Sequence, residues 1–186
     1  MQPIDLEKAL AIQGWMSPAE LRWLAERARA CQVIVEFGSF KGRSTRALAD
    51  HCSGVVYAVD PWIRDYPTES GRPHGKIRAD VYADFEANLR DHLASGRVRA
   101  VQEFSGASLP ALEAEWGRAD LVFIDGDHRE AAVREDIIAA RVLVRPGTGI
   151  IAGHDYTHSS WPGVKRAVDA LFPRVGRCES IWWVTA

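Results

Sequence analysis

The stretch Val35-Glu36-Phe37-Gly38-Ser39-Phe40-Lys41-Gly42-Arg43-Ser44 decides the fold, because it runs from the end of a short apolar strand into a helix. Its two glycines, four positions apart, let the backbone turn tightly and approach a ligand closely. The helix that follows offers free N–H groups at its first turn. We therefore interpret Glu36–Ser44 as a ligand-binding loop at the edge of a sheet.

Short, continuous apolar runs recur along the rest of the chain. Runs of this kind, rather than alternating ones, are typical of parallel strands covered by helices on both faces. They lie at Val33–Val35, Val55–Val59, Leu121–Ile124 and Ile150–Ala152, with Val98–Val101 as a weaker candidate and Ser180–Thr185 as a final strand reached by a hairpin from about Arg174.

Helical patterns alternate with these runs. A capping serine, a proline and a glutamate at Ser17–Glu20 predict the start of one helix. Others are expected at Arg43–His51, Ala79–Leu93, Ser108–Glu115, Glu130–Leu143 and Val164–Phe172. The alternation predicts an α/β fold: a Rossmann-like, doubly wound, mostly parallel sheet in three α/β/α layers, with an antiparallel C-terminal strand.

We expect one domain over residues 1–186, because the chain is long enough for one buried core and too short for two. Within it, residues 1–30 are predicted to form a helical N-terminal segment. Residues 61–76, which carry several prolines and glycines, are interpreted either as a lid or substrate loop or as a plain surface insertion.

The composition excludes several classes of protein. A net charge of −2 predicts no nucleic-acid partner, and the absence of a long apolar run predicts no membrane partner. Three scattered cysteines and a start without a secretory signal pattern predict a cytoplasmic protein. A homo-oligomer stays open, because Trp182 and Trp183 point to opposite faces of the last strand and one of them could form a dimer contact.

The loop does not match two common nucleotide-binding motifs. A P-loop needs four residues between its glycines and a lysine after the second, whereas here three residues intervene and Arg43 follows. The dinucleotide fingerprint Gly-x-Gly-x-x-Gly is also absent. The acid before the first glycine is more informative, because the carboxylate of Glu36 would repel a pyrophosphate but suits the ammonium group of a methionine moiety.

A second acid, Asp60, ends the next strand along the chain. There a carboxylate can accept hydrogen bonds from both hydroxyls of a ribose. Each acid also has a structural alternative: Glu36 could be a strand-end charge that reaches solvent, and Asp60 could cap the turn at Pro61. Together, at the ends of two neighbouring strands, they favour a cationic ligand that carries a ribose.

Four motifs in order carry a resemblance to a known family: Glu-Phe-Gly-x-x-x-Gly from Glu36, Val-Asp-Pro-Trp from Val59, Phe-Ile-Asp-Gly-Asp-His from Phe123 and Ile-Ile-Ala-Gly-His-Asp-Tyr from Ile150. The chain resembles the class I S-adenosylmethionine-dependent methyltransferases. Within them it is similar to the branch that contains the metal-dependent sugar O-methyltransferases of macrolide biosynthesis. The resemblance covers roughly Cys31–Phe172.

The resemblance implies a set of cofactor contacts. Glu36, Gly38 and Gly42 would line the methionine end, with Ser39 and Ser44 in the same loop, and Asp60 would bind the ribose. Ser105 and Gly106 would approach the adenine, and Trp62 would flank the adenine ring unless it packs beneath the loop. Asp125 is also expected to bind the cofactor.

A second group of polar residues follows two further strands. Asp125 comes after Leu121–Ile124, and His154 and Asp155 come after Ile150–Ala152. Because adjacent strand ends meet in a doubly wound sheet, these side chains can converge on one divalent cation. Mg²⁺ or Mn²⁺ is expected.

His154 stands where the resembling enzymes usually have an acidic ligand. It indicates either a mixed nitrogen and oxygen site that favours Mn²⁺, Fe²⁺, Co²⁺ or Zn²⁺, or no metal at all. The structural alternative is that Asp125 or Asp127 caps the helix near Glu130.

His128 is the candidate general base, because histidine titrates near neutrality and this one follows Asp125 at the mouth of the cleft. The resemblance supports the role. His154 and His158 are alternative bases, and His74 in the loop at 61–76 could contact substrate.

The predicted reaction is methyl transfer to a hydroxyl of a small molecule, a sugar or another natural product, with Asp125 and His128 in the catalytic site. Four tryptophans, Trp15, Trp161, Trp182 and Trp183, could stack on such an acceptor, or they could be core or interface residues. Two rival hypotheses remain: a metal-dependent hydrolase or hydroxylase on the same scaffold, and a non-catalytic sensor or assembly subunit that binds S-adenosylmethionine.

Overall fold

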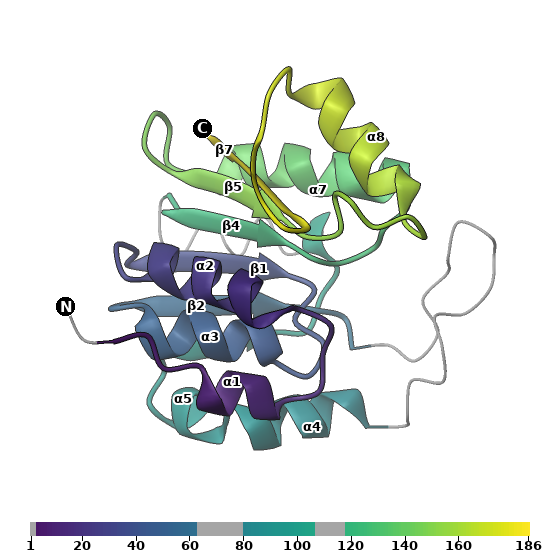
Figure 1. Ribbon diagram of the computed structural model, residues 1–186. Helices are drawn as coiled ribbons and strands as arrows, with labels where there is room; N and C mark the ends of the chain where they lie inside the picture. Colours follow the sequence, from purple (N-terminus) through teal and green to yellow (C-terminus); the bar gives the residue numbers. More distant parts are fainter. Residues whose placement is uncertain (1–2, 63–79, 107–117) are drawn as a thin grey trace.

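In the computed structural model, which describes residues 3–62, 80–106 and 118–186, a seven-stranded sheet carries helices on both faces (Figure 1). The strand order is β3-β2-β1-β4-β5-β7-β6. Strand β7 runs in the direction opposite to the other six strands. This confirms the predicted doubly wound sheet with an antiparallel C-terminal strand. The elements are α1 (Glu7–Ala11), α2 (Pro18–Ala28), β1 (Val33–Phe37), α3 (Arg43–His51), β2 (Val55–Val59), α4 (Val81–Asn88), α5 (Arg90–Ala94), β3 (Val98–Val101), β4 (Leu121–Ile124), α7 (Glu130–Leu143), β5 (Ile150–Gly153), α8 (Pro162–Leu171), β6 (Gly176–Cys178) and β7 (Ile181–Thr185).

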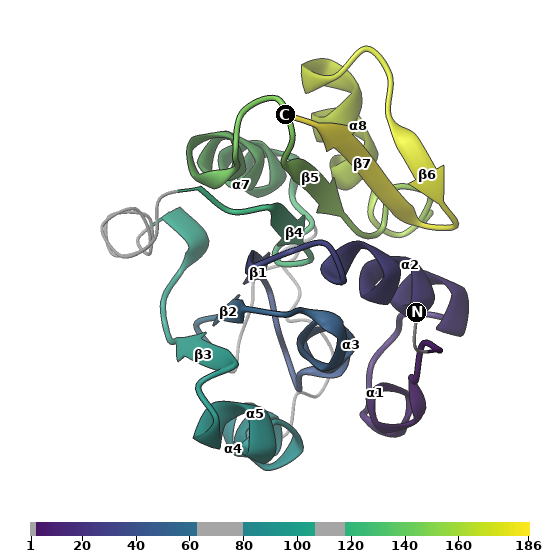
Figure 2. The same ribbon diagram turned by 90° about the vertical axis from the view of Figure 1, so that its left-hand side faces the viewer.

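The continuous apolar runs arise because both faces of the sheet are covered. In β1, Ile34 packs into a cluster with α1, α2, α3 and α4, whereas Val35 and Phe37 pack into a second cluster with α7 and α8. Figure 2 views the sheet nearly end-on and separates these two layers. Successive side chains of a strand point to opposite faces, so a strand between two helical layers has to be apolar throughout.

Most predicted boundaries hold, and the differences have local causes. The helices predicted at Arg43–His51 and Glu130–Leu143 are observed with those ends. The predicted helix Ala79–Leu93 is divided into α4 and α5 at Leu89, whose buried side chain packs against the turn at Gly42. Helix α8 begins at Pro162, two residues before the predicted start, because proline is favoured in the first turn.

Two predicted segments fall where the structure gives no description. The helix predicted at Ser108–Glu115 lies outside the described residues, and so does the loop at 61–76 except for Pro61 and Trp62. Among the described helices, none combines the length and the apolar composition that crossing a bilayer requires.

The two tryptophans of β7 are both engaged within the chain. Trp182 is buried against Phe172, and Trp183 packs on the opposite face against Trp23 and Arg27. These contacts within the chain do not test the dimer contact that the sequence left open, so the homo-oligomer stays a prediction.

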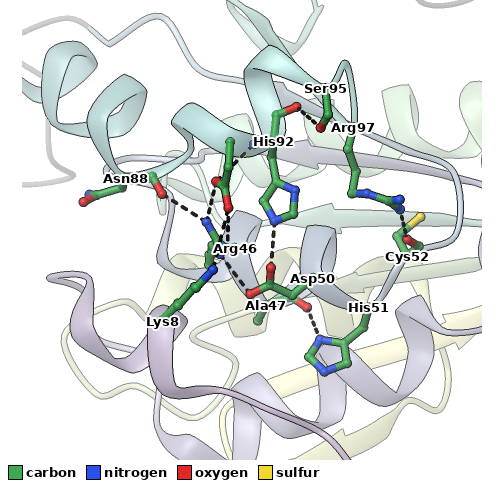
Figure 3. Close-up of polar contacts among 11 residues, drawn as sticks. Lys8, Arg46, Ala47, Asp50, His51, Cys52, Asn88, His92, Ser95 and Arg97 are labelled. Carbon is green, nitrogen blue, oxygen red and sulfur yellow. Dashed lines mark hydrogen bonds and ion pairs between the residues drawn. The ribbon is translucent and has the colours of Figure 1, made fainter. Parts of the chain in front are cut away.

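A buried ion pair fixes α3, the helix that follows the ligand-binding loop. The guanidinium of Arg46 is 5% exposed and donates to Asp50 at 2.9 Å and to Asp91 of α5 at 2.7 and 2.9 Å (Figure 3). His92 also reaches Asp50, at 2.7 Å. A two-pronged contact of this kind holds both helices in one orientation.

Replacing Arg46 with methionine should lower the free energy of unfolding by about 2 kcal/mol, because Asp50 loses one of its two partners while Asp91 can return to water. Urea unfolding followed by circular dichroism measures the loss. Arg90→Met, an exposed change on α5, is the matched control and should stay within about 0.5 kcal/mol. Equal effects of the two changes would contradict a structural role for the Arg46 pair.

Candidate active site

The predicted functional residues gather at one edge of the sheet, where β1, β2, β4 and β5 end. The strand order reverses at this edge, because β1 is followed along the chain by β2 on one side and pairs with β4 on the other. Open α/β sheets bind their ligands outside such a reversal point. The fold therefore places the candidate site between the loops that follow β1 and β4.

Glu36 does not reach solvent, contrary to one of its two sequence interpretations. Its side chain is 0% exposed, and its Oε2 accepts hydrogen bonds from the hydroxyls of Ser39, at 2.7 Å, and Thr45. Its other oxygen, Oε1, is buried without a hydrogen-bond partner among the described residues. Burial raises the pKa of Glu36 to about 7, although the neighbouring hydroxyls oppose the rise. A buried carboxylate oxygen of this kind is suited to a cationic ligand group.

Gly38 lets the loop after β1 touch the loop after β4. Its φ is +87°, and a Cβ at this position would lie 2.2 Å from the carbonyl oxygen of Asp125. A side chain is excluded on both grounds. The backbone N–H of Asp125 donates to Phe37 at 2.7 Å, which holds the two loops together.

Asp60 supports the same loop from β2. Its Oδ2 accepts the backbone N–H groups of Ser39 and Phe40 at 3.0 and 2.9 Å, and its Oδ1 accepts that of Trp62 at 2.7 Å. The turn-capping alternative for Asp60 is therefore observed. Trp62 packs beneath the loop, where its indole donates to Phe40 and its ring lies 4.8 Å from that of Phe85.

The residues after β3 contact α7 through a carboxyl group that the sequence analysis missed. Ser105 donates to Asp136, which is 6% exposed, while Gly106 is exposed. Burial raises the pKa of Asp136 to about 7. A signal was present, because Asp136 falls at helical spacing from Val133 and Ala140 on the core face of α7.

The second cluster brings together Asp125, His154 and Asp155. His154 Nδ1 lies 3.6 Å from Asp125 Oδ1 and 3.4 Å from Asp155 Oδ2. One potential ligand atom from each residue lies within 4.8 Å of the others, and this is the one such group within residues 3–62, 80–106 and 118–186. Neither aspartate candidate provides a side-chain cap for α7: its N-cap is Arg129, whose N–H is bound by Asp127 just outside the helix.

The charges in this cluster are strongly coupled. Burial alone would lower the pKa of His154, but the carboxylates of Asp125, Asp155 and Glu20 outweigh burial and raise it to about 12. Burial opposes ionisation of Asp155 too, yet hydrogen bonds from His128 and His154 hold its pKa well below the ordinary value. The acidic groups therefore require a positive charge at their centre, either a proton on His154 or a metal cation.

His128 is fixed on two sides. Its Nε2 lies 2.7 Å from Asp155 Oδ2, and its ring stacks on Trp161 with centroids 4.6 Å apart and an interplanar angle of 22°. Asp155 itself has a φ of +61°, a backbone conformation unusual for a residue other than glycine. Unusual backbone conformations persist where the surrounding contacts enforce them, and they cluster at functional sites.

Glu20 of α2 is a member of this cluster that the sequence did not reveal. The capping pattern at Ser17–Glu20 is confirmed, because Glu20 accepts the N–H of Ser17 at 2.8 Å. Glu20 also contacts His154 Nε2 at 3.1 Å. Nothing in the spacing of residues 20 and 154 indicates this contact. The other histidine candidates are peripheral: His158 is exposed, and His74 lies outside the described residues.

The fold and the strand-end groups define a class of protein. The doubly wound, mostly parallel sheet with its antiparallel C-terminal strand is a Rossmann-like fold, and solved structures of methyltransferases share it. A family model described as Methyltransferase domain matches residues 35–156, more than half of the chain. The chain belongs to this family and is an S-adenosylmethionine-dependent methyltransferase.

Solved structures share the fold at low sequence identity. CalS11, a calicheamicin methyltransferase, superposes with a TM-score of 0.70 at 16% identity, covering 89% of this chain and 76% of that one. An O-methyltransferase from Bacillus cereus, in complex with SAH, superposes with a TM-score of 0.68 at 22% identity, covering 99% of this chain and 92% of that one. The O-methyltransferase TomG from Streptomyces achromogenes, in complex with SAM, superposes with a TM-score of 0.67 at 19% identity, covering 97% of this chain and 89% of that one. No curated protein sequence matches the chain significantly.

The buried carboxyl of Glu36 should make stability depend on pH. Because its pKa is raised on folding, the native state binds a proton more tightly than the unfolded chain, so this contribution is present below about pH 4.5 and is lost as the pH rises through about 7. Glu36→Gln removes it. Between pH 5 and pH 8, without cofactor, the wild type should lose about 2–3 kcal/mol relative to the variant in urea unfolding. Parallel pH profiles would contradict the raised pKa.

Proposed function

We propose that this methyltransferase transfers the methyl group of S-adenosylmethionine to a hydroxyl oxygen of a small molecule, with His128 as the general base. The observation that carries the proposal is the pairing of His128 with Asp155 at 2.7 Å, with His128 in the same loop after β4 that touches Gly38 through Asp125. A histidine oriented by a carboxylate is the usual arrangement of a protein base. S-adenosylmethionine supplies the activated methyl group.

The donor would lie across the loop after β1. The unpartnered Oε1 of Glu36 fits its ammonium group, and Gly38 lets the loop after β4 pack directly against this loop. We assign the methionine end of the donor to five residues of this loop and its strand: Glu36, Gly38, Ser39, Gly42 and Ser44. The ribose is assigned to Asp60, and the adenine to Ser105 and Gly106, with Trp62 beneath the loop. Asp125 is assigned to the side of the methyl group. Lone pairs of Asp60 remain for ribose hydroxyls, because each of its oxygens can accept more than the observed N–H groups.

His128 would remove the proton from the acceptor. The imidazole of His128, held by its contact with Asp155, would take the hydroxyl proton as the oxygen attacks the methyl carbon. The carbon–sulfur bond breaks, and its electron pair stays on sulfur. Asp155 stabilises the imidazolium that forms, so its ionised state, favoured by its lowered pKa, suits this role.

Asp125, Asp155 and His154 would hold a divalent cation, and the donor set fits one. Two carboxylates and an imidazole nitrogen converge, and their negative charge suits a cation at the centre. The nitrogen ligand favours Mn²⁺ and other transition metals over Mg²⁺. Such an ion lowers the pKa of a hydroxyl that it binds. Metal binding would release the proton that His154 otherwise retains.

The acceptor is proposed to be a sugar or another natural-product hydroxyl. Two of the similar structures come from such chemistry: CalS11 is described as a TDP-rhamnose 3′-O-methyltransferase, and TomG is described as involved in tomaymycin synthesis. In this chain, Trp161 lies against His128, and Trp15 is 80% exposed and packs on Phe40 of the cofactor loop. Both could contact the ring of an acceptor.

One observation favours the non-catalytic sensor as a second candidate. The cluster around His154 is balanced by a proton alone, so the residues can be structural without a metal. Calorimetric titration with S-adenosylhomocysteine, with and without Mn²⁺, followed by an assay against nucleotide sugars, separates the two candidates. Binding without turnover of any acceptor favours the sensor, and metal-dependent turnover favours the enzyme.

His128→Ala should lower kcat by about a hundred- to ten-thousand-fold while leaving the affinity for S-adenosylhomocysteine nearly unchanged, because the base acts on the acceptor proton. Release of S-adenosylhomocysteine measures kcat, and calorimetry measures the affinity. His51→Ala is the matched control, since His51 ends α3 and bonds to Ala47. Retained turnover in His128→Ala would exclude His128 as the base.

Removal of metal should abolish turnover reversibly. Dialysis against EDTA is expected to lower kcat at least tenfold, and Mn²⁺ should restore it better than Mg²⁺ because of the nitrogen ligand. Cofactor affinity, measured in parallel, should change little. Full activity after EDTA treatment, in protein shown by elemental analysis to be metal-free, would refute the metal proposal.

A further inference from the structure

The cation cluster extends into the N-terminal helix α2. Glu20 is 4% exposed, and its carboxylate accepts the backbone N–H groups of Ser17 at 2.8 Å and Ser180 at 3.0 Å. Backbone N–H groups can only donate, so both oxygens of Glu20 act as acceptors here. Its third partner, His154 Nε2 at 3.1 Å, must therefore supply the hydrogen of that contact.

This contact determines which nitrogen of His154 faces the other carboxylates. With Nε2 bonded to Glu20, Nδ1 is directed toward Asp125 at 3.6 Å and Asp155 at 3.4 Å. Only Nδ1 can then serve as a ligand. A carboxylate that binds the far nitrogen of a ligating histidine fixes the orientation of its ring and raises its basicity as a ligand.

We infer that Glu20 is a positioning residue for cation binding: it holds His154 so that Nδ1 joins Asp125 and Asp155 around a divalent metal ion. This inference rests on the proposed function, because it assumes that the cluster takes a cation. Glu20 contacts neither the ion nor the reacting atoms and acts through His154. The same carboxylate also ties the start of α2 to the turn between β6 and β7, which keeps the histidine from turning away.

The test compares two substitutions in one helical turn. Glu20→Gln keeps the size of the side chain but loses the charged double acceptor. Ser17→Ala removes the capping hydroxyl of the same turn without touching His154. Circular dichroism and thermal unfolding first show that both variants are folded. They also show whether the two substitutions weaken α2 to the same extent.

Co²⁺ is the probe, because its visible absorption reports the ligands directly and needs no turnover. We expect Glu20→Gln to weaken Co²⁺ binding by about ten- to a hundredfold and to change the absorption bands, while Ser17→Ala changes affinity less than threefold. If Glu20→Gln does not fold, Glu20→Asp takes its place; it keeps the charge on a shorter side chain and should weaken binding by an intermediate factor.

The outcomes separate the two levels of the proposal. Wild-type protein that binds no Co²⁺ overturns the cation site and, with it, the role of Glu20. Wild-type binding together with unchanged affinity and spectrum in the Glu20 variant overturns the role of Glu20 alone. Equal losses in the Glu20 and Ser17 variants also overturn it, because they would show that only the helix cap matters.

Discussion

The close approach of Gly38 to the carbonyl of Asp125 is the constraint on which the rest of the site depends. It brings the loop that ends β1 against the loop that ends β4, and no residue with a side chain can take its place without moving one of them. The buried acid of the first loop and the acidic cluster of the second are thereby held in a fixed relation. A methyl donor and an acceptor have to meet at such a boundary, because transfer needs the reacting atoms in line.

Buried acidic groups give the two halves of the site the same electrostatic demand, a positive charge. On the donor side, one oxygen of Glu36 is buried without a partner, so the protein has excess negative character that a cofactor can neutralise. On the acceptor side, the excess is larger, because three carboxylates surround His154. The histidine in place of a further acid limits that excess. Both halves are therefore prepared for positive charge, which explains why so many acids can be buried at one sheet edge.

Much of the fold could be predicted from local sequence, because continuous apolar runs and capping residues report burial and helix starts directly. The gathering of Asp125, His154 and Asp155 followed from the expectation that adjacent strand ends meet in a doubly wound sheet, whereas the pairing of β1 with β4 was not predicted. Glu20 could not be predicted, since its contact with His154 depends on how α2 lies over β5 and not on any periodic pattern. The contact between Trp183 and Trp23 could not be predicted for the same reason, because Trp23 comes from a distant helix.

The bond from Ser180 to Glu20 has a consequence for how the chain acquires its structure during synthesis. Residue 20 leaves the ribosome early, yet the carboxylate that begins α2 meets its last two partners only after residues 154 and 180 have been made. Contacts of such long sequence separation slow folding. The apolar face of α2 can pack on α3 as soon as that helix has been made, whereas the polar contacts of Glu20 have to wait until nearly all of these 186 residues are available.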